Sequence, residues 1–175
     1  MRLACVTGRF QPVHNGHLEL FAAAIAEHDL LIVAVTNPDP EFRALEDTAP
    51  HRHRDDANPF TYYERYRLLT AALRCQGLAG RAAIVPFDLA RPGCWANYVP
   101  LSATQFVRVF TTWERTKARR LSEGGYRVVA LVGDPATKLS ATTVRAALRT
   151  GQGWERYVPA GVADVLRTMP YRTRR

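Results

Sequence analysis

Lysine is nearly missing from this sequence: it occurs twice in 175 residues, as Lys117 and Lys138, so arginine supplies almost all of the positive charge. The three cysteines are widely spaced and lack metal-ligand spacing, which argues against both a disulfide framework and a cysteine-based zinc site. No apolar run approaches the ~18 residues that a membrane helix requires. The first six residues lead directly into an expected strand, which predicts no signal peptide. These absences together predict a protein of the reducing cytoplasm.

The composition that remains is that of a folded domain. With 47% hydrophobic and 10% aromatic residues, the chain can bury a core, which argues against disorder. The net charge of +8 and the isoelectric point near 9.9 allow two interpretations: a solvated, arginine-rich surface or a site for a polyanionic ligand. The arginines are scattered and no nucleic-acid-binding motif occurs, so a nucleic-acid-binding module is a remote alternative and nucleic acid is not the expected partner.

The expected organisation is a single domain over residues 1–170, followed by a basic tail over residues 171–175. Within the domain, short apolar runs alternate with helical patterns. Continuous hydrophobic strands between helices are typical of the α/β class and predict a Rossmann-like, doubly wound parallel sheet. The strands are predicted at 3–7, 30–35, 83–85, 106–110 and 127–132, and the helices at 17–27, 61–74, 114–123, after 140, and at 159–168.

Ligands of such sheets bind where the strands end, and one segment there has the chemistry of a phosphate site. It runs from Gly8 to His17, after the first strand and into the first helix. Gly8 and Gly16 let the backbone approach a ligand closely, and the helix N-terminus offers unpaired N–H groups. His14 and His17 can both face this seat and donate hydrogen bonds to phosphate oxygens. Protonated, they would also offset the charge on a departing pyrophosphate.

Two other interpretations of the histidines stay open on spacing alone. They could be a metal pair, although helical zinc sites favour a spacing of four residues and need a third ligand. They could also be ordinary polar residues of a loop. The longest loop expected elsewhere, residues 37–58, is rich in Pro, Asp, Arg and His, and loops of this length are often lids or binding segments.

A second segment, Ser140 to Arg145, carries another helix start. Ser140 is a good N-cap residue, and Thr142 and Arg145 fall on one side of the first turn. Alone, this is simply a capped helix. Paired with the histidine segment, it supplies a second helix N-terminus that can face the same triphosphate from the opposite side.

These two segments resemble the signatures of a known superfamily. Gly8–His17 is similar to the histidine signature that nucleotidylyltransferases share with class I aminoacyl-tRNA synthetases, and Ser140–Arg145 is similar to its Ser-x-Thr-x-x-Arg signature. Across essentially the whole chain, the sequence resembles the small nicotinamide-mononucleotide (NMN) adenylyltransferases of archaeal type. Further matches are Asn58-Pro59-Phe60-Thr61, Glu64-Arg65, Trp95, Gly125-Tyr126, Trp154-Glu155 and Val158-Pro159.

The resemblance implies an enzyme that transfers a nucleoside monophosphate from a nucleoside triphosphate to a small phosphate-type acceptor and releases pyrophosphate. It implies that His14, His17 and Arg145 are catalytic. It also implies a Mg²⁺ ion that bridges phosphate oxygens without protein ligands, and a homo-oligomer, the common state of relatives. The residues that it places around the triphosphate are Gly8, Arg9, Phe10, Gln11, Gly16, Ser140, Thr142 and Thr143.

The sequence departs from the resemblance at positions that would select the acceptor and the base. The Ser-Ala-Gln segment that the family has after the second strand is replaced by Thr36-Asn37-Pro38, and tyrosines replace Ala and Gly in the second helix. The Asn-Pro pair after the fourth strand is also absent. The candidate selectivity residues are therefore Thr36, Asn37, Tyr62, Tyr63, Arg65, Trp95, Glu114 and Arg115.

The departures leave two main interpretations of the substrates open, and a third in which the acceptor is neither of those two. The first is NMN adenylyltransferase, an enzyme of NAD synthesis that uses ATP. The alternative is a relative that transfers CMP from CTP to a small phosphonate such as phosphonoformate, because Tyr62 and Tyr63 would narrow the acceptor site and the basic loop 51–54 would suit an anion. Five residues are also candidate contacts for an anion, and the sequence does not indicate which of them matters most: Arg9, Arg43, Arg65, Arg115 and Lys138.

Overall fold

The computed structural model describes residues 1–43, 45 and 52–169; the tail predicted at 171–175 and His51 of the basic loop lie outside these residues. Five strands form one parallel sheet: β1 Leu3–Gly8, β2 Leu30–Thr36, β3 Ala82–Phe87, β4 Thr104–Val109 and β5 Val128–Val132. Their order is β3-β2-β1-β4-β5. The chain thus winds outward from β1 in both directions, which opens a crevice at the carboxyl ends of β1 and β4.

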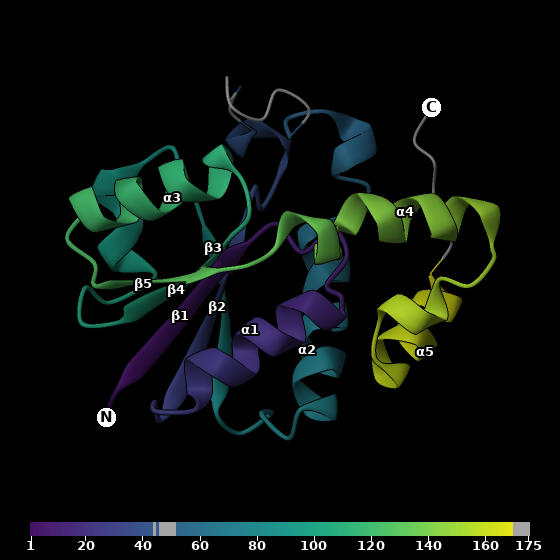
Figure 1. The fold of residues 1–175 in the computed structure, drawn as a ribbon, viewed down its shortest axis with the longest axis horizontal. Helices are drawn as coiled ribbons and strands as arrows, with labels where there is room; N and C mark the ends of the chain where they lie inside the picture. The colour runs from purple at the N-terminus through teal and green to yellow at the C-terminus, as the bar shows by residue number, and fades with distance from the viewer. Residues whose placement is uncertain (44, 46–51, 170–175) are drawn as a thin grey trace.

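Helices cover both faces of the sheet, which confirms the predicted Rossmann-like architecture (Figure 1). Successive side chains of a strand point to opposite faces. Val6 and Val33 therefore face the core under α1 and α2, whereas Cys5 and Ile32 face the core under α3. Burial on both faces explains why the inner strands are continuous apolar runs. The helices are α1 Asn15–Ile25, α2 Tyr62–Cys75, α3 Thr112–Glu123, α4 Ala141–Thr150 and α5 Ala160–Thr168.

The last two helices extend the fold beyond the edge of the sheet (Figure 1). α5 packs against α2, and the buried side chains of Val162 and Leu166 join the core on that face. α4 instead begins at the carboxyl edge of the sheet, where its N-terminus can reach a ligand. None of the helices in the described part of the chain is long and apolar enough to span a bilayer.

Capping boxes of threonine and glutamate set the start of α2 and α3. Thr61 and Glu64 form the one predicted for α2, with the Thr61 N–H donating to the Glu64 carboxylate at 2.7 Å. Thr111 and Glu114 form a second one at α3, also at 2.7 Å. α3 therefore begins at Thr112, two residues before its predicted start, because Thr111 satisfies the free N–H groups of the first turn.

Candidate active site

A cleft of about 450 Å³ lies at the carboxyl edge of the sheet, where the topology opens the crevice. Three segments form its wall: the loop from β1 into α1, the first turns of α3, and the chain from the end of β5 to the first turn of α4. Below it, the Thr7 hydroxyl donates to the Gln105 side-chain oxygen at 2.9 Å and links β1 to β4. The two sequence segments that resemble phosphate signatures are therefore brought to one cleft.

Backbone conformation shapes the loop after β1. Phe10 has a positive φ of 50°, which turns its buried ring back beneath the loop. A Cβ at Gly8 would lie 2.9 Å from that ring, so glycine is required by close packing there. The ring then meets His17 edge-on, with centroids 4.9 Å apart. Phe10 thus supports a histidine from below.

His14 and His17 lie against one another at the start of α1, with ring centroids 3.8 Å apart. The His17 Nδ1 accepts a hydrogen bond from the His14 backbone N–H at 3.2 Å. A neutral imidazole that accepts at Nδ1 carries its proton on Nε2, so His17 keeps a donor for a ligand. The His14 Nδ1 is buried and has no hydrogen-bond partner among the described residues. Both rings line the cleft, as predicted.

The protonation state of the histidines differs from the sequence-based expectation. Burial lowers the pKa of His14 to about 3. Burial also lowers the pKa of His17 well below its usual value, and the nearby His14 and Lys117 add to the shift. Both rings are therefore neutral at pH 7. They can donate hydrogen bonds to a phosphate, but the positive charge of the cleft comes from other residues.

The N-terminus of α4 forms the opposite wall. The Ser140 hydroxyl caps the helix by accepting the Thr143 N–H at 3.2 Å, as its position predicted. Ser140 and Thr142 line the cleft. The Thr143 hydroxyl lies 3.0 Å from the Ser140 hydroxyl and is not among the lining side chains, so its contribution is to the cap.

Arg145 is buried behind this wall rather than in it. Its guanidinium donates to the Gln11 carbonyl at 2.9 Å and to the Thr142 hydroxyl at 3.1 Å. Gln11 is buried as well: its side-chain amide donates to the Phe60 carbonyl and accepts the Phe60 N–H, each at 2.9 Å. Arg145 therefore joins the α4 wall to the loop after β1, and Gln11 joins that loop to the chain before α2.

Arg65, a predicted selectivity residue, is a buried clamp on the backbone. From α2 its guanidinium donates to the carbonyls of Arg9 at 3.0 Å, Thr36 at 2.8 Å and Asn37 at 2.7 Å. It thereby holds the loops after β1 and β2 together. Burial lowers its pKa only to about 10, so it keeps its charge at pH 7.

The other predicted selectivity residues are dispersed. Of the eight, only Glu114 lines the main cleft, while Thr36 and Asn37 line a smaller cavity beside it. Trp95 is a core residue that stacks on Phe87 and donates its indole N–H to the Asp88 carbonyl at 2.7 Å. The rest lie outside both cavities: Arg65, the half-buried Tyr62 and the exposed Tyr63 and Arg115.

Several cleft residues were not named individually as site residues from the sequence, and four of them matter most for its charge and shape; one of the four, Arg52, belongs to the basic loop predicted at 51–54. Lys117 reaches from α3 to the end of β1, where its ammonium donates to the Thr7 carbonyl. Arg52 lies over the Trp113 ring, 4.6 Å from its centroid, and this pair separates the two cavities. Arg108 is the fourth. Helical periodicity places Trp113 and Lys117, four residues apart, on one face of α3, and this was the available signal.

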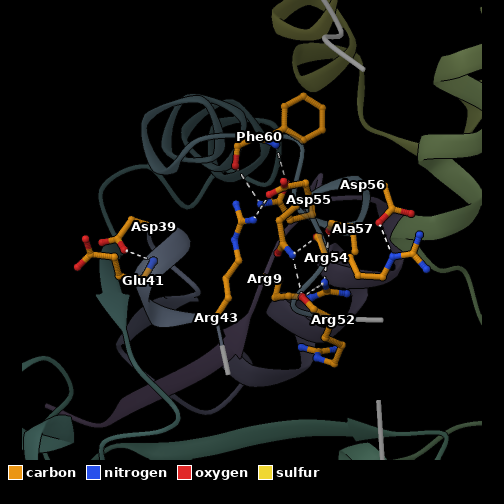
Figure 2. A network of polar contacts seen from close by, with 12 residues as sticks. Arg9, Asp39, Glu41, Arg43, Arg52, Arg54, Asp55, Asp56, Ala57 and Phe60 are labelled. Carbon is orange, nitrogen blue, oxygen red and sulfur yellow. Dashed lines mark hydrogen bonds and ion pairs between the residues drawn. The ribbon is translucent and has the colours of Figure 1, made fainter. Parts of the chain in front are cut away.

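Two of the predicted anion contacts, Arg9 and Lys138, line the cleft. Figure 2 shows Arg9 among its polar contacts with the chain before α2. Its guanidinium donates to the carbonyls of Arg52 at 3.1 Å and Ala57 at 3.3 Å, which fixes the chain before α2 against the cleft. Burial, together with the neighbouring guanidinium groups, Arg52 first among them, lowers the pKa of Arg9 to about 8. Arg43 is instead paired with Asp55. An anion bound beside Arg9 would relieve this repulsion between like charges.

The acidic side chains of the cleft do not cancel its charge. Five cationic and three acidic side chains line it within the described residues. Glu19 is paired with Arg108 at 2.7 Å, and Asp134 accepts a backbone N–H from its own turn. Glu114 binds Lys138 at 2.8 Å. Although burial would raise the Glu114 pKa, hydrogen bonds from Lys138 and Thr111 lower it to about 2. The cleft is therefore electropositive and suited to an anion.

Comparison with known sequences agrees with this geometry. The model of the cytidylyltransferase-like family matches residues 5–147. A phosphonoformate cytidylyltransferase of Streptomyces viridochromogenes is 38% identical over 93% of this chain and 89% of its own length. A nicotinamide-nucleotide adenylyltransferase of Thermococcus onnurineus is 32% identical over 91% of this chain and 79% of its own.

Comparison with solved structures supports the fold. A bifunctional NMN adenylyltransferase/ADP ribose pyrophosphatase of Francisella tularensis superimposes with a TM-score of 0.67 over 96% of this chain, at 16% sequence identity. The chain spans about half of that longer protein, 49% of its length. At this identity the likeness concerns the architecture alone.

Proposed function

The chain belongs to the cytidylyltransferase-like family, and from that premise we propose that this nucleotidylyltransferase moves CMP from CTP to a small phosphonate acceptor, releasing pyrophosphate. The main observation in support of this proposal is that positive charge is concentrated beside a very small cavity. Arg9, Arg52 and Lys117 all line the part of the cleft that adjoins the ends of β1 and β2. This combination favours a compact acceptor with several negative charges.

The cavity behind Arg52 and Trp113 limits the acceptor's size. Its volume of about 20 Å³ has room for roughly one water molecule. Thr36, Asn37 and Asp88 form its other walls. A nicotinamide riboside group would need this wall to move, whereas a phosphonate with a short substituent fits in front of it. The identity to a phosphonoformate cytidylyltransferase points the same way.

The reaction needs positioning more than acid–base chemistry. An acceptor oxygen attacks the α-phosphorus, the bond from that phosphorus to the β-phosphate oxygen breaks, and pyrophosphate leaves with the electron pair. The attacking oxygen is already ionised at pH 7, so no residue has to remove a proton. His14 and His17 from α1, with Ser140 and Thr142 from α4, would donate hydrogen bonds to the phosphate oxygens and so stabilise the charge on the leaving group.

Mg²⁺ is expected to enter with the nucleotide. Within the described residues, no group of three His, Cys, Asp or Glu side chains is arranged to hold a metal ion. The donor set of the cleft, neutral imidazoles and hydroxyls, instead suits phosphate oxygens. When bound to the triphosphate, Mg²⁺ would neutralise part of its charge.

NMN adenylyltransferase remains the second candidate. It is favoured by the 32% identity to an archaeal-type enzyme over nearly the whole chain. The two functions differ in both substrates and can be separated by one assay.

The test is pyrophosphate release from ATP, CTP, GTP and UTP, each offered with NMN, phosphonoformate or methylphosphonate in the presence of Mg²⁺. We expect turnover with CTP and phosphonoformate to exceed every other pair by at least about tenfold, a specificity difference of about 1.4 kcal/mol. Preferred turnover of ATP with NMN would replace the proposal by the second candidate. No pyrophosphate release with any pair would contradict both.

A further inference from the structure

Lys117 lines the cleft together with the two histidines and with Arg9 and Arg52, and its ammonium reaches the end of β1. We infer that Lys117 is a catalytic residue of the proposed transfer: its ammonium group contacts the acceptor's phosphonate and the α-phosphate together, at the point where the new bond forms. This inference rests on the proposed function and adds the residue that joins its two substrates.

The first argument is where the side chain ends. α3 follows β4, and Lys117 extends from it across the crevice to donate to the Thr7 carbonyl at the end of β1. An ammonium has three N–H donors. Within the described part of the chain, Thr7 is its hydrogen-bond acceptor, which leaves two donors for a ligand. Since Lys117 lines the cleft, those donors are within reach of a bound anion.

The second argument is the set of groups that face the ammonium. His17 of α1 and Arg52, from the chain before α2, line the same cleft as Lys117, and each is close enough to interact electrostatically with it. Cys5 of β1 and Glu114 of α3 also act on the ammonium, and Glu114 is already bound to Lys138. Lys117 is therefore a cation near both a phosphate donor of α1 and the arginine at the acceptor end of the cleft.

The third argument is the chemistry required where the acceptor meets the α-phosphate. The ionised acceptor and the triphosphate repel one another, and the transfer brings an oxygen of the first against the α-phosphorus of the second. A compact ammonium can donate one hydrogen bond to each and reduce that repulsion. Burial, with a smaller effect of Arg52, lowers the pKa of Lys117 to about 8. Two anions beside it would raise this pKa again and hold the ammonium in its charged form.

The composition adds an independent point. Arginine outnumbers lysine by 22 to 2 in this chain (24 basic residues less Lys117 and Lys138). Both lysines nevertheless line the cleft. An ammonium acts as a compact point charge with three rotatable donors, whereas a guanidinium is a planar fork suited to bidentate pairing, which gives a physical reason for lysine at this position.

Kinetics provide the first test. With CTP and phosphonoformate, Lys117→Met should lower kcat by about two orders of magnitude or more, because a charge that acts at the transferring phosphoryl group is lost. Lys117→Arg should recover part of that loss. Arg119→Met is the matched control: Arg119 is exposed on the same helix and pairs with Glu123, so wild-type kinetics are expected. Wild-type kcat in a folded Lys117→Met variant would overturn the inference.

Nuclear magnetic resonance tests the wild-type chain and does not depend on the folding of a variant. With ¹³Cε-labelled lysine the protein shows two lysine side-chain signals, and Lys138→Met assigns them. Adding α,β-methylene-CTP and phosphonoformate together should raise the pKa of Lys117 by about one unit or more. An unchanged Lys117 titration, in a wild-type enzyme that turns over CTP and phosphonoformate, would overturn the inference alone. Absence of that turnover would instead overturn the proposed function.

Discussion

At the scale of single residues, the two histidines of the cleft are neutral at pH 7 and placed to donate hydrogen bonds. The His14 N–H fixes the His17 ring through Nδ1 at 3.2 Å, and the Phe10 ring supports it from below. The orientation of His17 is thus determined before a ligand arrives. Preorganised donors of this kind stabilise the charge that develops in a transition state without any reorganisation during the reaction.

His17→Ala should therefore lower turnover by about two orders of magnitude or more, the usual effect of removing one such donor. The variant should stay folded, which circular dichroism can establish before steady-state pyrophosphate release is measured. His28→Ala is a suitable control because His28 lies between α1 and β2, outside the residues that line the cleft. Wild-type turnover in folded His17→Ala protein would contradict the role of this residue.

At the scale of elements, two buried arginines hold the cleft's loops together. Arg145 of α4 and Arg65 of α2 both direct their guanidinium groups at backbone carbonyls rather than at the cleft. Backbone carbonyls at the end of a strand or in a loop receive no hydrogen bond from a neighbouring strand. A long side chain with several N–H donors can supply that hydrogen bond. The arrangement of loops after β1 and β2 depends on these contacts.

Arg65→Met should lower the free energy of unfolding by about 3 kcal/mol or more, because the carbonyls of Arg9, Thr36 and Asn37 lose their donor while buried. Urea denaturation followed by circular dichroism measures this loss. Arg67→Met, at an exposed position of the same helix, is the matched control and should change stability by less than about 0.5 kcal/mol. Equal stability of the two variants would show that the clamp contributes nothing.

At the scale of the whole molecule, burying neutral histidines makes folding sensitive to pH. His14 titrates near 6.5 when exposed but near pH 3 in the folded protein. Between these values the unfolded chain binds more protons than the folded one. The free energy of unfolding must therefore fall as the pH drops below 6.5. Glu114 adds a similar loss only below its usual pKa of 4.5, because its folded pKa is about 2.

Between pH 6.5 and pH 5, stability should consequently decline, and the decline should be shallower in His14→Gln, whose buried amide does not titrate. Urea denaturation at pH 7, 6 and 5 gives both slopes. Identical slopes in the wild type and in His14→Gln would mean that His14 is not the group that takes up the proton.

Features that depend on residues close together in the sequence were largely predicted correctly, whereas features that depend on distant residues were predicted only in part. Strand and helix positions came from periodicity, and the capping box at Thr61 marked the start of α2 correctly. The predicted phosphate residues His14, His17, Ser140 and Thr142 do meet in one cleft. The selectivity residues were harder to predict, because a motif aligns positions along the chain but does not tell which side chain faces the ligand. Tyr63 is exposed outside the cleft, while Trp113 lines it.

The sequence by itself determined the parallel α/β fold, the carboxyl edge of the sheet as the place of the site, and the two helix starts that form it, since apolar periodicity, capping residues and short motifs act over a few residues. Only the tertiary structure decided that Arg65 and Arg145 lie behind the cleft and support the backbone, while Arg9 and Lys117 line the cleft itself. The reason is that the role of a long cationic side chain depends on which carbonyls and charges lie within reach of its end. Most of those groups are supplied by residues 27 to 134 positions away in the chain.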